Sequence, residues 1–417
     1  MPASAVWEVA VAKSEILAGL DIGSTKVCAT VAEVYGDGRA DVIGVGLVPC
    51  GGLKRGVVVD MDATATAVRE SVDLAQRVSG AEIHTVVVSV TGEHISSLNS
   101  PGRVAITQDD REVRHDHVER VLDASRVIVL PPEREIIHAI PRGFRIDGQA
   151  GIKDPVGMAG RRLEVETHIV TGGTSFLQNV TKCVAKAGLE TESLVLTSIA
   201  SGLSVTSQEE RELGVAVIDC GGGTTDIAVF IEGEVYYTAV LPIGGTHVTH
   251  DIAVGLQSSQ DEAERAKREA GCAKVDMVLQ GETFQVAALG SSEPRQVPRH
   301  VLAQLIEPRV EEIFEMARRE IDRSGHLGLL PMGVALTGGT ALLPGVVDSA
   351  ARILETPTRV EVPRGIGGMV DSVASPIYST AVGLVLYAAR HRGLAYDNGR
   401  APSLLANVVT GIKKLFR

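Results

Sequence analysis

The sequence predicts an α/β protein with a duplicated fold, in which two similar lobes surround a shared ligand cleft. Residues 215–229 read VAVIDCGGGTTDIAV, which is an apolar strand, an aspartate, a glycine-rich turn and a second strand. Residues 16–31, ILAGLDIGSTKVCATV, follow the same design. A pattern that recurs about two hundred residues later is typical of a duplicated fold. A small α+β insertion and a C-terminal amphipathic helix complete the predicted architecture.

The composition is that of a globular protein with two or three domains. The chain has 417 residues, of which 44% are hydrophobic and 22% charged. The net charge of −12 and an aromatic content of 3% argue against a nucleic-acid partner. The five cysteines are scattered without a CxxC pair, which favours reduced thiols in a cytosol. Residues 1–14 lack the basic start of a secretory signal and are not expected to act as one, and the uncharged run 372–389 is expected to be too polar for a membrane span.

The first turn begins after Asp21 and contains Gly23, Ser24 and Thr25. Backbone N–H groups in such a turn form a concave site for an anion, so we expect phosphate to bind there. Lys26 follows directly and is interpreted either as a phosphate partner or as a solvated lysine of the hairpin.

The second turn carries the stronger signal because three glycines stand together. Consecutive glycines are entropically costly and indicate backbone that passes close to a ligand. An aspartate at the mouth of a phosphate site would repel phosphate directly, but it suits a hydrated Mg²⁺. We therefore expect Asp21 and Asp219 to hold Mg²⁺ through water, and Asp226 to help position the metal or a water. An ordinary glycine-rich hairpin is the alternative. The residues predicted to bind phosphate here are Gly221, Gly222, Gly223, Thr224 and Thr225.

The elements between the two turns follow from hydrophobic periodicity. Residues 42–48 and 56–60 are expected to be further strands of the first sheet. Residues 61–78 have the apolar spacing of an amphipathic helix, and residues 84–90 form a β-branched strand. Residues 92–166 read as an α+β insertion. Its charged run Arg114–His117 is interpreted as a solvated helix face, because neighbouring residues on a helix point apart.

Later segments extend the pattern. Residues 194–205 are rich in small side chains and predict either a helix that crosses a domain junction or a generic core helix. Residues 260–270 predict a charged helix, and residues 301–321 a long helix with a kink or break at Pro308. A third strand ends at Gly338 and Gly339, a pair that lets a ligand approach the backbone before the next helix.

The C-terminal segment differs from the rest of the chain. Residues 393–402 predict a linker, and residues 403–417 read SLLANVVTGIKKLFR. At ~100° per residue the apolar side chains fall within an arc of roughly 140°. Basic residues flank this face, which indicates a helix that lies in the surface of an anionic membrane. Docking of the helix on its own domain is the alternative. The predicted membrane residues are Leu404, Leu405, Val408, Val409, Ile412, Lys413, Lys414, Leu415 and Phe416.

Taken together, these motifs resemble the actin/Hsp70/sugar-kinase ATPase superfamily. The stretches that carry the resemblance are 20–27, 194–204, 215–229, 334–345 and 379–384. The resemblance implies an actin-like ATPase fold with ATP and Mg²⁺ between the lobes and phosphates on the first two turns. It implies that the turn at Gly338 and Gly339 lies against the adenosine of the bound nucleotide. It also places Glu264, Lys267 and Arg268 against the ribose and base, although on spacing alone they form a solvated helix.

Within the superfamily the chain resembles the FtsA family of bacterial actin-like cell-division proteins, most specifically in residues 137–165 and in the tail. The resemblance implies a protein that polymerises and binds the tail peptide of the tubulin-like protein FtsZ. It would anchor FtsZ to the cytoplasmic face of the plasma membrane at the septum, alongside other division proteins. Arg295 and Arg309 are the candidates for contacting an acidic peptide, or they are solvated arginines. The turns imply ATP binding and at most a weak ATPase.

The resemblance also divides the chain into parts. The predicted parts are a first lobe (14–91 and 167–205), an insertion (92–166), a second lobe (206–250 and 302–392), a small subdomain (251–301), a linker (393–402) and the amphipathic helix (403–417). Two alternatives share the superfamily fold. A metabolic kinase would need a catalytic base and a sugar pocket that the sequence does not show, and an adaptor of the type IV pilus would not explain residues 137–165 or the tail.

Overall fold

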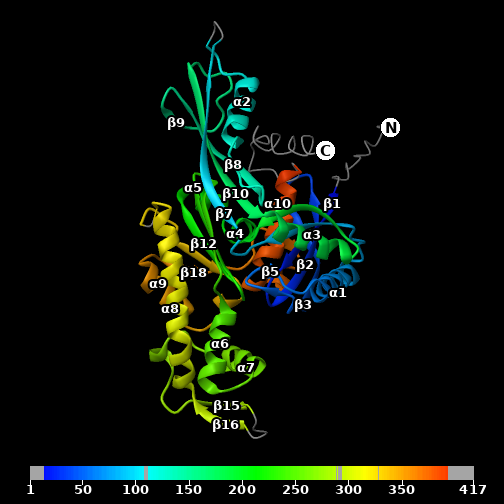
Figure 1. Ribbon diagram of the computed structural model, residues 1–417, viewed down its shortest axis with the longest axis vertical. Coiled ribbons are helices and arrows are strands. Elements are labelled where there is room, and N and C mark those ends of the chain that lie inside the picture. The colour runs from blue at the N-terminus through cyan, green and yellow to red at the C-terminus, as the bar shows by residue number, and fades with distance from the viewer. Residues whose placement is uncertain (1–13, 108–110, 288, 290–293, 327, 393–417) are drawn as a thin grey trace, which may run out of the picture.

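The computed structural model describes residues 14–107, 111–287, 289, 294–326 and 328–392. Two large sheets form its centre, a third sheet stands at one end, and the β15–β16 hairpin lies at the other (Figure 1). The predicted linker and amphipathic helix, residues 393–417, lie outside the described residues. Within the described ranges no helix combines the length and apolar character needed to cross a membrane.

The first lobe is built on a six-stranded sheet. Its strands, in spatial order, are β11 (Glu190–Leu196), β6 (Thr85–Val90), β1 (Ser14–Ile22), β2 (Lys26–Tyr35), β3 (Ala40–Pro49) and β19 (Gly367–Gly368). Helices α1 (Met61–Ser79) and α3 (Thr174–Lys186) cover one face, where alternate residues such as Leu20 and Val31 are fully buried. Leu17 and Val34 point to the other face, which α10 (Ser379–His391) covers. The predicted hairpin, helix and following strand are confirmed.

The second lobe repeats this design. Its sheet runs in the order β14 (Glu234–Leu241), β13 (Thr225–Ile231), β12 (Val215–Cys220), β17 (Val334–Thr337) and β18 (Thr358–Val360). In each lobe the hairpin that carries the glycine turn is antiparallel, and its first strand pairs in parallel with a later strand, β6 or β17. Helices α6 (Gly245–Leu256), α8 (Arg299–Arg323) and α9 (Val346–Leu354) bury one face of the sheet. The predicted duplication is therefore confirmed.

Two small-residue helices connect the lobes. Helix α4 (Thr197–Val205) crosses α10 so closely that a Cβ atom on Gly383 would collide with the carbonyl oxygen of Ala200. The Ser204 hydroxyl donates a hydrogen bond of 2.7 Å to the carbonyl of Ser379. The structure thus favours the junction over the generic core helix. The helix starts only at Thr197, because residues 194–196 complete strand β11.

The insertion is a four-stranded sheet with one helix. Strands β7 (Ser96–Ala105), β10 (Arg162–Gly173), β8 (Arg134–Ile146) and β9 (Gln149–Ile152) lie in that order. Helix α2 (His115–Arg126) packs on one face, where Val121 and Leu122 are fully buried. Strand β10 pairs with β7 from Arg162 to Thr171 and with β8 from Leu163 to Gly173, so this sheet continues to Gly173.

The small subdomain lies beyond α6 and contains α7 (Gln260–Ala270), a short 3₁₀ helix (Val275–Met277) and the hairpin of β15 (Thr283–Ala287) and β16 (Pro294–Pro298). Helix α7 presents Ala263 and Ala266 to the core of the second lobe.

Three predictions of secondary structure need correction or refinement. Residues 56–60 do not join the first sheet, because β4 (Leu53–Lys54) and β5 (Val57–Val58) pair only with each other. Helix α8 continues through Pro308 without a break. The third turn leads into a 3₁₀ helix (Gly339–Leu342) before α9 begins. The remaining elements are α5 (Gln208–Leu213) and two 3₁₀ helices, Val370–Val373 and Pro376–Tyr378.

Candidate functional site

The first turn connects β1 to β2 through three residues. The Gly23 amide donates a hydrogen bond of 2.9 Å to the carbonyl of Lys26, which closes the hairpin. The amides of Ser24 and Thr25 donate no hydrogen bond to any described residue. Backbone N–H groups that are left over in a turn attract anions, so this turn retains the donors that phosphate would need.

The second turn is held by its carbonyl groups. The amides of Gly245 and Thr246, at the start of α6, donate to the carbonyls of Gly221 (2.9 Å) and Gly222 (2.8 Å). The Thr340 hydroxyl donates to the same Gly221 carbonyl at 3.1 Å. These hydrogen bonds hold the turn through the carbonyl oxygens of Gly221 and Gly222, and they leave the amide N–H groups of the turn available for a ligand. Those of Gly222 and Gly223 have no acceptor within the described part of the chain.

The two turns touch each other across the cleft. A Cβ atom on Gly222 would lie 2.5 Å from Cγ2 of Thr25, and one on Gly223 would overlap the Ser24 hydroxyl. Glycine is therefore required at both positions by the opposite lobe, and not only by the turn itself. The contact brings two sets of free amides close enough to share one chain of phosphates.

Asp21 forms a buried ion pair in the first lobe. The Lys26 ammonium lies 2.6 Å from Oδ2 of Asp21, and the Ser89 hydroxyl donates to Oδ1 at 2.9 Å. Burial alone would lower the pKa of Lys26, but the Asp21 carboxylate outweighs this and holds the pKa above its ordinary value. Lys26 is thus an ion-paired lysine with a side chain that is only 22% exposed, and its contact with phosphate stays a prediction.

Asp219 and Asp226 are buried acids at the ends of β12 and β13. The Thr380 hydroxyl donates to Oδ2 of Asp219 at 2.9 Å, and burial together with the charge of Asp21 raises the pKa of Asp219 to about 6. Thr91 and Thr224 donate to the two oxygens of Asp226 at 2.6 and 2.9 Å. Burial, followed by the charge of Asp219, raises the pKa of Asp226 to about 8.

This group of carboxylates fits a hydrated Mg²⁺. Hard carboxylate oxygens are the ligands that Mg²⁺ prefers, usually with several waters retained. Both oxygens of Asp21 already accept hydrogen bonds, so Asp21 fits a metal through water better than by direct contact. Among the described residues, no group of three or more His, Cys, Asp or Glu side chains is arranged to hold a metal directly.

The third turn and α7 complete one side of the site. Gly338 has a φ of 85°, and a Cβ atom there would overlap Oδ1 of Asp219. The Lys267 ammonium lies 2.6 Å from Glu264 and donates to the Thr249 hydroxyl at 2.8 Å and to the Gly245 carbonyl at 3.0 Å. Glu264 and Lys267 therefore face the first turn of α6, whose N-terminal amides hold the second glycine turn. Arg268 is 77% exposed and lies 4.0 Å from Glu264.

Sequence reasoning missed the hydroxyl groups that support these acids. Ser89 and Thr91 stand at the carboxyl end of β6, which pairs with β1, and polar residues at the end of a β-branched strand were a usable signal. Thr380 gave no signal, because it starts a buried helix 161 positions from its partner Asp219.

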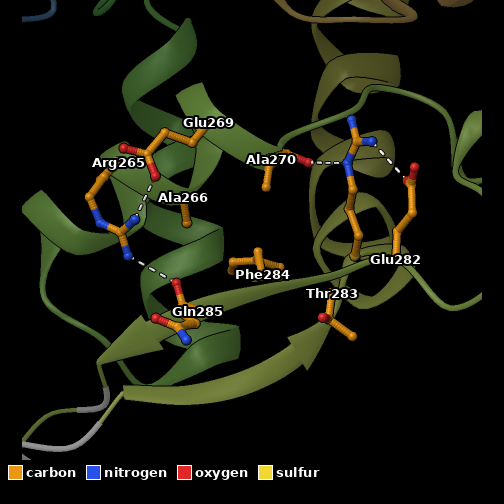
Figure 2. A pocket seen from close by; sticks show the side chains of 9 residues that line it. Arg265, Ala266, Glu269, Ala270, Glu282, Thr283, Phe284 and Gln285 are labelled. Atoms are coloured by element: carbon orange, nitrogen blue, oxygen red, sulfur yellow. Dashed lines mark hydrogen bonds and ion pairs between the residues drawn. The ribbon is translucent and has the colours of Figure 1, made fainter.

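The two predicted peptide-binding arginines lie on β16 and α8, and both bind groups of α6. Arg295 donates to the carbonyl of Leu256 at 2.6 Å. Arg309 binds Asp251 through two hydrogen bonds of 2.6 and 3.2 Å. A cavity of about 400 Å³ lies between α7 and β15, and its lining includes Arg265, which Figure 2 shows, and Arg299. This cavity shares no residue with the glycine turns.

Comparison with known proteins gives consistent matches. A family model described as "Cell division protein FtsA" matches residues 216–383, and one described as "SHS2 domain inserted in FTSA" matches residues 92–171. The chain is 44% identical over 377 residues to cell division protein FtsA of Pseudomonas aeruginosa, which covers 90% of each chain. It is 36% identical over 411 residues to FtsA of Escherichia coli, which covers 96% of each chain.

Solved structures confirm the predicted actin-like fold. The "PilM-PilN type IV pilus biogenesis complex" matches with a TM-score of 0.65 at 18% identity, over 91% of this chain and 99% of that chain. MreB5 of Spiroplasma citri bound to ADP matches with a TM-score of 0.52 at 13% identity, over 88% of this chain and 94% of that chain. At these identities the likeness concerns the fold alone. The pilus adaptor and the metabolic kinase are not favoured, because the curated relatives named above are cell division proteins.

Proposed function

The chain belongs to the FtsA family of cell division proteins, and we propose that it binds ATP with Mg²⁺ between its lobes and anchors FtsZ to the membrane. The observation that carries the proposal is the contact between the two glycine turns, with free amides on both sides and three buried carboxyl groups beside them. The free amides suit a chain of phosphates, and the buried carboxyl groups suit a divalent cation bound to it.

Each group in the site has a proposed part in binding. The free amides of both turns receive phosphate oxygens, and Lys26 neutralises charge at Asp21. Asp219 and Asp21 hold Mg²⁺ through water, and Asp226 orients the metal or a water. Gly338 and Gly339 lie against the adenosine, with Glu264, Lys267 and Arg268 toward the ribose and base. The negative phosphates of bound ATP attract the free amides of both turns and so hold the lobes together. Hydrolysis of ATP is at most weak.

The proposed partners are FtsZ, further copies of this chain in a filament, an anionic membrane and other division proteins. Arg309 supports the site for the acidic FtsZ peptide because it already binds a carboxylate, that of Asp251, in a two-point geometry. An incoming acidic peptide would replace Asp251. The apolar and basic pattern of residues 403–417 supports attachment to the cytoplasmic face of the plasma membrane at the septum.

The proposal is tested by sedimentation with lipid vesicles. The full chain is mixed with anionic vesicles, FtsZ and ATP–Mg²⁺, and each component is omitted in turn. We expect FtsZ to pellet with the vesicles only when the chain is present, and the chain to pellet without FtsZ. A chain that ends at residue 402 should leave both proteins in solution, and Ile412→Asp should weaken pelleting strongly. If the shortened chain still pellets with vesicles, the proposed anchor is wrong.

A further inference from the structure

The hairpin of β4 and β5 places Arg55 beside both glycine turns. The Gly56 amide donates a hydrogen bond of 3.1 Å to the Ser24 hydroxyl in the first turn. A Cβ atom on Gly223, in the second turn, would lie 3.1 Å from Cα of Arg55. Arg55 therefore belongs to the first lobe by sequence but lies against the phosphate turn of the second lobe.

The backbone at Arg55 is unusual for its residue type. Arg55 and Gly56 form the two-residue turn between β4 and β5, with φ values of 50° and 77°. Such turns favour asparagine, aspartate or glycine, since other side chains are strained at positive φ. Strain of this kind is tolerated where the side chain has a function. The position thus retains arginine against the local preference of the turn.

The charge of Arg55 has no acidic partner among the described residues. Lys26 is paired with Asp21 and Lys267 with Glu264. The exposed Arg55 side chain makes no ion pair or hydrogen bond within the described ranges. Its charge nevertheless reaches the start of α6. Burial lowers the pKa of His247, and the Arg55 guanidinium lowers that pKa further.

The contacts of the hairpin identify the end of the site that Arg55 occupies. Gly56 packs against the backbone of Thr91, whose hydroxyl donates to Asp226. Gly338 and Lys267 contact Asp219 and Gly245 instead, on the side proposed for adenosine. Arg55 is therefore on the Asp226 side of the two turns, where the phosphate most distant from the nucleoside would lie.

We propose that Arg55 binds the terminal phosphate of a nucleoside triphosphate and thereby distinguishes triphosphate from diphosphate. The inference rests on the proposed nucleotide function and adds a residue from outside both glycine turns. Guanidinium binds phosphate oxygens through two parallel hydrogen bonds, and a diphosphate would lack the group that Arg55 contacts. Because Arg55 touches Gly223 from the opposite lobe, binding at this position also favours the closed cleft.

The test is calorimetric titration of the full chain with ATP–Mg²⁺ and with ADP–Mg²⁺. For Arg55→Gln we expect ATP affinity to fall roughly tenfold, while ADP affinity changes less than about twofold. Arg55→Lys should recover part of the ATP affinity, because it restores the charge without the two-point geometry. Lys54→Gln, the exposed neighbour in the same hairpin, is the matched control and should leave both affinities unchanged.

The outcomes separate this inference from the function on which it rests. An unchanged ratio of ATP to ADP affinity in Arg55→Gln would overturn the role of Arg55 while leaving nucleotide binding intact. Equal losses for ATP and ADP would also overturn it, since they would indicate a general effect of charge or folding. A wild-type chain that binds neither nucleotide would overturn the proposed nucleotide function itself.

Discussion

The imidazole Nε2 of His168 lies 2.9 Å from the hydroxyl of Thr238, and this contact joins the insertion to the second lobe. The other ring nitrogen lies 2.8 Å from the Asn99 side chain, and the Ser97 hydroxyl donates to the Thr238 carbonyl at 2.8 Å. Thr238 belongs to β14, which leads directly to the α6 N-terminus that holds the second glycine turn. A short length of chain therefore connects the insertion to the candidate nucleotide site.

Thr238→Val should lower the free energy of unfolding by about 1–2 kcal/mol, because it leaves the buried His168 nitrogen without its partner. Urea unfolding measures the change. Thr191→Val is the matched control, since the Thr191 hydroxyl on β11 is buried with no hydrogen-bond partner among the described residues. The control should be neutral or slightly stabilising. Equal losses in the two variants would show that the His168 contact contributes nothing specific.

Gly383→Ala should destabilise the protein by about 2–4 kcal/mol, although alanine is the better helix former by about 1 kcal/mol. The added Cβ atom would collide with the Ala200 backbone, which cannot move without separating α4 from α10. Gly255→Ala is the control, because in α6 the new atom would meet only the Leu305 side chain, which can turn away, and no backbone atom. Thermal unfolding of both variants tests the expectation, and a stabilised Gly383→Ala would contradict it.

Asp226→Asn should become more stable relative to the wild type as pH rises from 5 to 8 in the absence of nucleotide. Burial raises the pKa of folded Asp226 to about 8, whereas the unfolded side chain ionises near its ordinary value. The stability that the protonated carboxyl contributes is complete below the unfolded pKa and is lost as pH rises toward the folded pKa. The difference between the two proteins should grow by at most about 1.4 kcal/mol per pH unit. A difference that is constant with pH would show that Asp226 is ionised throughout.

Asp219→Ala should weaken ATP binding at least about tenfold in the presence of Mg²⁺, and the remaining affinity should depend little on the metal. The physical reason is that Asp219 is a buried carboxylate that interacts with the charge of Asp21 and lies against Gly338 of the third turn, where it is proposed to hold the metal. Calorimetric titration with ATP, with and without Mg²⁺, gives both quantities. Asp123→Ala on α2 of the insertion is the control. Unchanged ATP affinity in Asp219→Ala would show that Asp219 does not take part in nucleotide binding.

The prediction that residues 56–60 form a strand of the first sheet was wrong, and the reason is physical. Three valines in a row favour a strand, and periodicity cannot tell which sheet a strand joins. In the structure only Val57 and Val58 pair, and they pair with Leu53 and Lys54. The segment is therefore a hairpin whose turn carries Arg55 to the opposite lobe. A prediction of one continuous strand therefore hid the turn at Arg55, the residue proposed to contact phosphate.

The sequence by itself determined the duplicated turns and the aspartates at their edges, because each is a local pattern of strand, acid and glycine within about fifteen residues. Only the tertiary structure decided that Thr25 touches Gly222, that Thr380 and Thr91 support the buried acids, and that Arg55 lies between the lobes. These contacts join residues far apart in the chain. Their partners are selected by how two sheets and a shared pair of helices pack, and local periodicity carries no information about that packing.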